Sequence, residues 1–195
     1  MKARHAYYGP RHKAGFNPVS HEEMYIYLVQ NVHGNPRLEP QRWPAVMRDL
    51  LADFGGHIGE VRSRITDPRR IVHRPVGSLL MPAPWYRGRV VLIGDAAHGM
   101  LPHQGQGANT TIEDAVTLAG LLSRRSAQPL IDVFAHYAGL RKARTRVVQR
   151  SSWATNAALH LADDGALERR NSVLARFPER FGWIHSFDAL RAAAE

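Results

Sequence analysis

The feature that most constrains this fold is the stretch from Arg89 to Leu122. Arg89–Ile93 is a nearly continuous apolar run that ends at Gly94, which predicts a strand buried on both faces and followed by a turn. Asp95 comes next, and a glycine-rich loop with one proline separates it from an amphipathic segment. Thr110 and Glu113 form a capping box, which predicts that a helix begins near Thr110. One apolar stripe is predicted as the buried face of that helix: Ile112, Ala115, Val116, Ala119 and Leu122.

This order of strand, acid, glycine loop and helix suits a large, partly anionic ligand. Gly105 and Gly107 lack a Cβ atom, so the backbone there can approach a flat ring or a phosphate closely. The start of the helix favours an anion or an electron-rich carbonyl, whereas Asp95 accepts hydrogen bonds from hydroxyls. A ligand with a polyol and an electron-poor ring satisfies both. The alternative is an ordinary α/β strand–turn–helix without a ligand.

This stretch resembles the second FAD-binding motif of the aromatic-ring hydroxylases, the flavoprotein monooxygenases with the p-hydroxybenzoate and salicylate hydroxylase fold. The matching segment is GDAAHGMLPHQGQGANTTIEDAVTLAGLL. The resemblance implies that Asp95 binds the ribityl chain and that Pro102 lies against the isoalloxazine ring. It also implies that the turn and helix start face the pyrimidine end of the flavin, through Gly105, Gln106, Gly107, Ala108 and Asn109.

The first thirty residues predict a sheet. The segments HAYYG, HKAGF and EMYIYLVQ are strand-like and are separated by turn residues. In the resembled family such a sheet roofs the substrate cavity, which implies that Met24, Tyr25 and Tyr27 lie on the substrate side, within reach of Pro102. Arg74 is a candidate wall of the same cavity. For any single tyrosine the alternative is a plain half-buried strand residue.

The rest of the chain predicts mostly helices. A helix is expected over Pro40–Phe54, and Glu60–Ile65 fits a strand or a short helix equally well. Strands are expected at Ile71–Pro75 and Ser78–Leu80, and a long helix over Leu130–Leu161, with its arginines on the solvent side. The predicted fold class is α/β (α+β), in three parts: a mixed substrate-side sheet with one helix at 1–75, the strand–loop–helix FAD motif at 76–125 and a helical segment at 126–195.

Composition narrows the classes of partner. The formal charge of +9 invites a nucleic-acid interpretation, but the basic residues are spread along the chain and no nucleic-acid module is recognised. A solvated basic face that steers an anionic substrate is favoured. There is no cysteine, and His98 and His103 are not spaced as metal ligands, so no metal site is expected. With no signal peptide or membrane span recognised, a soluble, cytoplasmic protein is expected.

The GxGxxG turn that holds the ADP half of FAD in this family does not occur in the sequence. We therefore expect the carboxyl-terminal half of a hydroxylase, working with a GxGxxG-containing partner chain or as a homodimer. The resemblance implies that NADH or NADPH reduces FAD, and that a flavin hydroperoxide transfers one oxygen atom to an aromatic substrate. The isolated chain is expected to bind FAD weakly and not to turn over. The alternative is a non-catalytic partner subunit or pseudoenzyme fragment.

Overall fold

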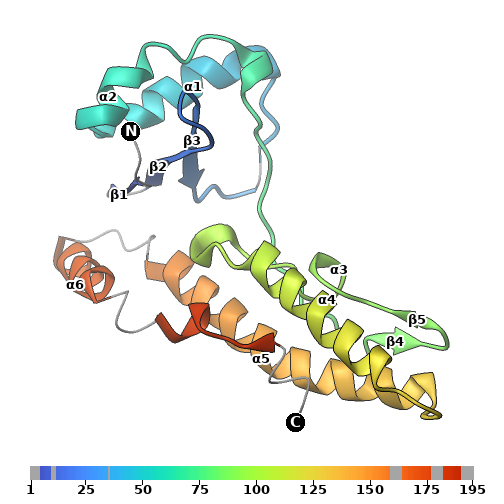
Figure 1. The fold of residues 1–195 in the computed structure, drawn as a ribbon. Coiled ribbons are helices and arrows are strands. Elements are labelled where there is room, and N and C mark those ends of the chain that lie inside the picture. Colours follow the sequence, from blue (N-terminus) through green and yellow to red (C-terminus); the bar gives the residue numbers. More distant parts are fainter. Residues whose placement is uncertain (1–4, 10–11, 35, 159–163, 177–181, 190–195) are drawn as a thin grey trace. The chain divides into compact units, whose positions relative to one another are not determined.

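The computed structural model describes residues 5–9, 12–34, 36–158, 164–176 and 182–189. The chain divides into two compact units (Figure 1). The first comprises Met1–Pro75 and Ala158–Asn171, and the second comprises Val76–Ala157 and Ser172–Glu195. The mixture of helices and sheet agrees with the predicted α+β class.

The first unit is built on a three-stranded antiparallel sheet in the order β1-β2-β3. Its strands are β1 (His5–Tyr8), β2 (His12–Pro18) and β3 (Met24–Gln30). In the register, Ala14 of β2 pairs with Tyr7 on one side and with Leu28 on the other. All three strands expected from the sequence are therefore confirmed.

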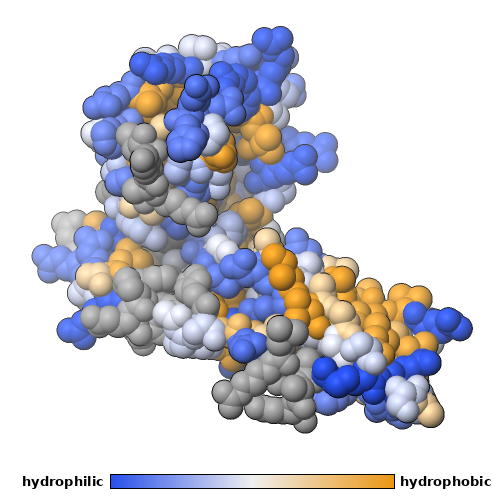
Figure 2. Space-filling model, viewed as in Figure 1, coloured by the Kyte–Doolittle hydropathy of each residue, from blue (hydrophilic) through white to orange (hydrophobic). Residues whose placement is uncertain are grey.

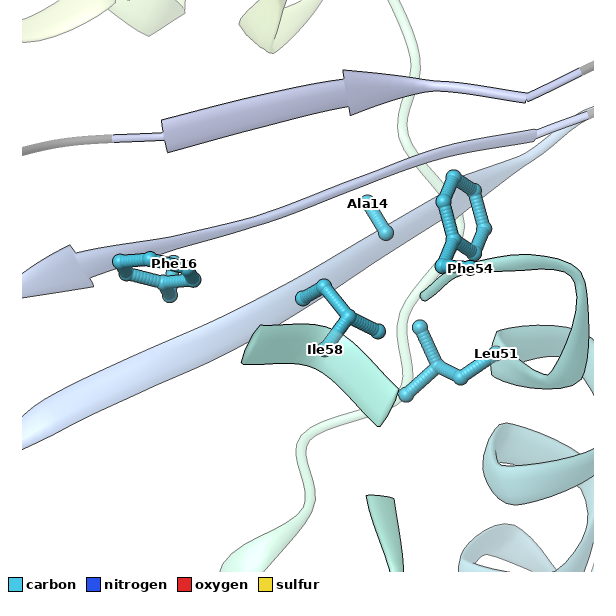
Figure 3. Close-up of a cluster of buried hydrophobic side chains, with 5 residues drawn as sticks. All are labelled: Ala14, Phe16, Leu51, Phe54 and Ile58. Carbon is cyan, nitrogen blue, oxygen red and sulfur yellow. The ribbon is translucent and has the colours of Figure 1, made fainter. Parts of the chain in front are cut away.

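One face of this sheet packs against short helices. The helices of this unit that contribute to this packing are α1 (Trp43–Leu50), η2 (Leu51–Asp53) and α2 (Gly56–Arg62), and two further short helices, η1 (Pro40–Arg42) and η3 (Pro68–Arg70), flank them in the sequence. The apolar cluster between sheet and helices is Ala14, Phe16, Leu51, Phe54 and Ile58 (Figure 3). The helix predicted over Pro40–Phe54 is confirmed, and the ambiguous segment that follows is helical as far as Arg62.

In α6 (Asp164–Ala175), Arg170 donates hydrogen bonds to the carbonyls of Tyr8 and Gly9 and so ties this helix to the end of β1.

No strand forms at the end of the first unit or at the start of the second, so the strands predicted at Ile71–Pro75 and Ser78–Leu80 are wrong. The N–H groups of Leu79 and Met81 donate to the carbonyls of Gly99 and Ala97, which makes isolated contacts instead of a ladder. A two-stranded hairpin follows, made of β4 (Tyr86–Arg87) and β5 (Val90–Val91).

The buried strand predicted at Arg89–Ile93 is also wrong. β5 contains only two residues, and the side chains of Val90 and Ile93 are 65% and 37% exposed. Among the described residues, β5 pairs with β4 alone, so it is not the central strand of a wider sheet. An apolar run signals burial, but it does not say whether the covering surface belongs to the same chain.

Two long helices, α4 (Gly107–Ser123) and α5 (Leu130–Ala158), dominate the second unit. Figure 1 shows them side by side, with the short η5 (Gly182–His185) close to α5. The long helix predicted from Leu130 is confirmed as far as Ala158; residues 159–161 of that prediction lie outside the described residues. Trp85, Ala97 and Tyr137 form an apolar cluster beneath these helices.

The predicted start and inward face of α4 are both wrong. The helix begins at Gly107, and the Thr110 hydroxyl donates to the carbonyls of Gln106 and Gly107 from inside it, so Thr110 is not a cap. Glu113 binds arginines of α5 and closes no capping box. Thr110, Asp114 and Thr117 form the buried face instead. On the predicted apolar stripe, Ile112 is 62% exposed and Leu122 is 39% exposed; Figure 2 shows hydrophobic residues gathered along this helix.

Candidate functional site

The site is built around a turn that only glycine can make. Gly94 has φ +58°, a conformation that side-chain-bearing residues rarely adopt, and a Cβ atom there would lie 2.8 Å from Thr111 Oγ1. Its N–H donates to Asp114 Oδ2 at 2.7 Å. The turn leads directly into α3 (Asp95–His98), whose first residue, Asp95, is exposed. The backbone therefore presents the Asp95 carboxylate at the surface.

The loop after α3 has an exposed side and an anchored side. Pro102, the first residue of η4 (Pro102–Gln104), is exposed, as are Gly105, Ala108 and Asn109. By contrast, His103, Gln104 and Gln106 are buried. Six of the seven residues assigned to the cofactor thus lie at the exposed or half-buried surface of the loop and helix start, and Gln106 is buried.

Polar side chains of α5 hold the anchored side. Gln104 Nε2 donates to Thr155 Oγ1 at 2.9 Å, and His103 Nε2 donates to Asn156 Oδ1 at 3.0 Å. Two further bonds reach the backbone of the loop, from Ser152 Oγ to the Leu101 carbonyl at 2.6 Å and from Gln149 Nε2 to the Gly99 carbonyl at 3.0 Å. Sequence reasoning missed these residues; the only signal was a run of uncharged polar residues in the second half of a long helix.

The exposed side fits a flat ring with a polar edge. Gly105 has φ +61°, and a Cβ atom built on it would meet nothing within 4 Å, so the space above it is open. No side chain caps the start of α4. The first N–H groups of a helix have no partner within it, and they carry the positive end of the helix dipole. An exposed carboxylate, a proline, an open glycine and an uncapped helix start match the chemistry of FAD.

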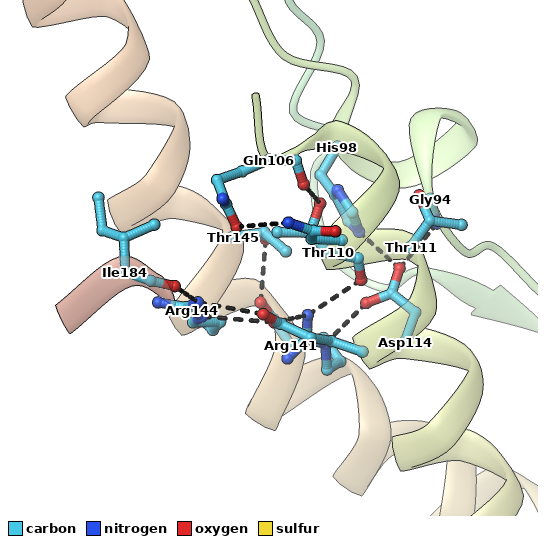
Figure 4. Close-up of polar contacts among 12 residues, drawn as sticks. Gly94, His98, Gln106, Thr110, Thr111, Asp114, Arg141, Arg144, Thr145 and Ile184 are labelled. Atoms are coloured by element: carbon cyan, nitrogen blue, oxygen red, sulfur yellow. Dashed lines mark hydrogen bonds and ion pairs between the residues drawn. The ribbon is translucent and has the colours of Figure 1, made fainter. Parts of the chain in front are cut away.

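A buried network of charges supports the turn from below (Figure 4). Asp114 of α4 accepts hydrogen bonds from His98 Nε2 at 2.6 Å and from Arg141 Nε at 2.7 Å, in addition to the one from Gly94. The side chains of His98, Asp114 and Arg141 are at most 1% exposed. One carboxylate therefore connects the Gly94 turn, α3 and α5.

The network continues along α5 toward the carboxyl-terminal segment. Glu113 accepts from Arg141 Nη2 at 2.6 Å and from Arg144 Nη2 at 3.1 Å. Arg144 also donates to the Ile184 carbonyl at 2.6 Å, and its guanidinium lies 4.6 Å from the centre of the Phe187 ring. The predicted solvent position of the arginine run is therefore wrong for Arg141 and Arg144. Their positive charges are needed inside because the adjacent acids Glu113 and Asp114 face inward.

The electrostatics of Asp114 follow from these contacts. Burial by itself would raise the pKa of the Asp114 carboxyl, but the hydrogen bonds from His98, Arg141 and the Gly94 N–H reverse this and hold the pKa below its ordinary value. Nearby, burial and the negative charge of Asp114 raise the pKa of Tyr137. Asp114 is thus a carboxylate that stays ionised at neutral pH.

The residues assigned to the substrate side belong to the first unit. On β3, Tyr25 and Tyr27 lie on the face opposite the apolar cluster, while Met24 alternates to the other face. Burial, with smaller contributions from Tyr8 and Tyr25, raises the pKa of Tyr27 to about 12. Arg74 is exposed and makes no ion pair with another described residue. The proximity of Met24, Tyr25 and Tyr27 to Pro102 stays a prediction.

Two further features are absent from the described residues. No group of three or more histidine, aspartate or glutamate side chains is placed to hold a metal ion. Nor does this part of the chain contain a helix with the length and apolarity that crossing a bilayer requires.

Comparison with known proteins places the chain in a family. Residues 2–150 match the family model described as FAD binding domain. The chain is 32% identical over 176 residues to the 2-heptyl-3-hydroxy-4(1H)-quinolone synthase of Pseudomonas aeruginosa (strain UCBPP-PA14), which covers 88% of this chain and 44% of that protein. It is 34% identical over 159 residues to the 3-amino-4-hydroxybenzoate 2-monooxygenase of Streptomyces platensis, covering 80% of this chain and 40% of that protein.

The fold is shared with solved structures. The structure of Klebsiella pneumoniae HpxO complexed with FAD and uric acid superposes with a TM-score of 0.78 at 20% identity, over 98% of this chain and 48% of that one. The chain spans less than half the length of the curated relatives it matches. Because the family model matches most of its length, the chain belongs to the FAD-binding-domain family, that of the FAD-dependent aromatic hydroxylases.

Proposed function

We propose that this chain is the substrate-side and flavin-ring part of a monooxygenase that hydroxylates an aromatic compound with NADH or NADPH and molecular oxygen. The observation that carries the proposal is the exposed surface formed by Asp95, Pro102, Gly105, Ala108 and Asn109, with its backbone fixed from below by α5. When bound, FAD supplies the redox chemistry, in which the aromatic substrate, NAD(P)H, a proton and oxygen yield the hydroxylated ring, NAD(P)⁺ and water. The chain's own residues supply binding, orientation and electrostatics.

Each part of the surface has a role in this proposal. The Asp95 carboxylate accepts hydrogen bonds from the hydroxyls of the ribityl chain. Pro102 offers an apolar face to the ring, and the glycines let the backbone approach the ring edge. The uncapped start of α4 stabilises negative charge at the pyrimidine end. A fixed dipole of this kind needs no rearrangement when charge develops.

We further infer that the outward apolar surface of the second unit packs against a GxGxxG-containing half. This surface contains Ile112 and Leu122 of α4 and, on the hairpin side, Val90 and Ile93. Exposed apolar groups that gather on one surface mark interaction sites. The curated relatives are more than twice as long as the matched segment, which supports a second half as the occupant rather than a second copy.

The lone chain is expected to hold FAD weakly. The missing glycine turn would supply the N–H groups for the pyrophosphate. Each charge-assisted hydrogen bond lost is worth about 1.5–3 kcal/mol, so several together weaken binding by about three orders of magnitude.

The test is to titrate FAD into the purified chain by fluorescence quenching, with and without a co-expressed GxGxxG-containing half. Tight binding and NAD(P)H oxidation are expected only with the second half, and Asp95→Asn should weaken binding there by about tenfold. Asp132→Asn, an exposed acid at the start of α5, is the matched control and should bind like the original chain. Tight FAD binding by the lone chain would contradict the weak-binding inference. A complex that never binds FAD would favour a non-catalytic subunit.

A further inference from the structure

The face of the β1-β2-β3 sheet that lies opposite the apolar cluster has a distinctive composition. Strand alternation and the observed register place its side chains together. They are Ala6, Tyr8, Lys13, Asn17, Tyr25, Tyr27 and Val29, with Gly15 between Lys13 and Asn17. This face therefore has one cation, three phenols and one amide, and no acid.

Lys13 is the unusual residue on this face. Its side chain is only 9% exposed, and its Nζ lies 5.1 Å from the centre of the Tyr8 ring and 5.8 Å from that of Tyr27. Among the described residues, Lys13 has no carboxylate partner and no hydrogen-bond acceptor. The two rings replace part of the lost hydration. A cation in this setting is nevertheless unfavourable, and burial lowers the pKa of the Lys13 ammonium.

The neighbours of Lys13 are held in place and act as donors. A Cβ atom on Gly15 would lie 2.5 Å from Tyr27 Oη and 2.3 Å from the His5 carbonyl, so glycine is what allows the Tyr27 ring to cross β2 beside Lys13. Burial raises the pKa of Tyr8, against the charge of Arg170, and raises that of Tyr27 to about 12. Both phenols therefore keep their protons at neutral pH. The face is a set of hydrogen-bond donors around a buried cation.

We propose that Lys13, flanked by Tyr8 and Tyr27, binds the anionic oxygen of an aromatic substrate, a carboxylate or a phenolate, and so determines specificity for anionic over neutral aromatic compounds. The inference rests on the proposed function, in which this sheet belongs to the substrate side. A ligand anion supplies the acceptor that the described residues do not, and the tyrosine rings supply flat contacts for its aromatic ring. Lys13 is thus a binding residue whose partner arrives with the substrate.

The test compares salicylate with its neutral amide, salicylamide, as probes of the chain co-expressed with a GxGxxG-containing half and with FAD added, because the lone chain is expected to hold FAD weakly. Affinities are measured by ligand-observed NMR at about pH 7. We expect a preference for salicylate of about tenfold or more, as one buried charge-assisted hydrogen bond provides. Lys13→Met and Lys13→Gln should abolish the preference and leave salicylamide affinity unchanged, while Lys13→Arg should keep part of it. Lys142→Met, on α5, is the control and should keep all of it.

Thermal unfolding separates a binding role from a structural one. Because Lys13 is buried without an acid, Lys13→Met should unfold at the same temperature as the original chain or higher. Destabilisation by both neutral variants, a preserved salicylate preference in either, or no salicylate binding by the original chain would each overturn the inference. FAD binding is scored separately by fluorescence quenching. Lys13-dependent salicylate binding without FAD binding would contradict the proposed function alone, and FAD binding without such a preference would contradict this inference alone.

Discussion

The interior of the first unit is apolar, whereas the contact between α4 and α5 in the second unit is made largely by charges. Ala14, Phe16, Leu51, Phe54 and Ile58 fill the first interior, and non-directional packing of this kind tolerates swaps of similar volume. The second depends on Asp114 and Arg141, whose hydrogen bonds fix both distance and direction. The interior held by directional hydrogen bonds therefore lies beneath the glycine loop and the start of α4, where the position of the backbone matters most.

The largest expected effect comes from removing the central carboxylate. Asp114→Ala leaves the buried Arg141 and His98 without their shared acceptor, and breaking a buried ion pair from one side costs about 3–5 kcal/mol. Urea unfolding of the full chain should show this loss of stability. Leu51→Met in the apolar interior should cost less than about 1.5 kcal/mol. Equal losses in the two variants would show that the two interiors do not differ as argued.

A smaller effect is expected at the turn above that carboxylate. Gly94→Ala forces a left-handed conformation on alanine, at about 1–3 kcal/mol, and also brings its Cβ against Thr111. Adding Thr111→Ala removes the two closest side-chain atoms, so the double variant should recover the contact part of the loss and keep the conformational part. Gly139→Ala, inside α5 with open space around it, is the control and should gain stability. Chemical denaturation measures all three variants.

The third prediction concerns the stability of the folded chain at acidic pH. Because the pKa of Asp114 is lower in the folded chain than in the unfolded one, its contribution is fully present above the unfolded pKa of about 3.9 and is lost as pH falls through the lower folded value. Stability measured by denaturation below about pH 4 should therefore fall more steeply for the original chain than for Asp114→Asn. Identical acid slopes would mean that Asp114 has an ordinary pKa in the folded state.

The smallest effect on stability is expected on the outer face of α4. Ile112→Glu replaces an exposed apolar side chain, so the free energy of unfolding should change by less than about 0.5 kcal/mol. Association with a GxGxxG-containing half should nevertheless weaken, which sedimentation measures. A variant that unfolds instead would show that Ile112 supports the interior of its own unit.

The parts of the fold that could be predicted are those set by local pattern. The three strands and the helix over Pro40–Phe54 follow from alternation, turn residues and helical spacing. The assignment of Asp95, Pro102 and the glycine loop to the flavin stays a prediction. The same reasoning predicted the wrong buried face for α4, because the apolar stripe that includes Ile112 and Leu122 faces outward. Periodicity finds an apolar face but not the molecule that covers it.

The supporting residues could not be predicted because their partners are distant in sequence. Arg141 lies 27 residues from Asp114, and nothing local marks an arginine within a charged helix as buried. The sequence nevertheless contains two relevant features. One is the adjacent pair of acids, Glu113 and Asp114, and the other is the pair of arginines one helical turn apart at 141 and 144. The acids are adjacent and the arginines are three residues apart, so their spacing alone does not pair them, and only the tertiary fold reveals the pairing.

The two faces of α4 should respond oppositely to ionic strength. Mobile ions screen exposed charges strongly and buried pairs weakly, so the contact through Asp114 should persist in concentrated salt. Salts such as sulfate make the burial of apolar groups more favourable. The face bearing Ile112 and Leu122 should therefore associate more strongly in the same solution. Concentrated sulfate should therefore drive the lone chain to associate while it remains folded. Low salt should therefore keep the chain dispersed, and concentrated sulfate should favour association through this face.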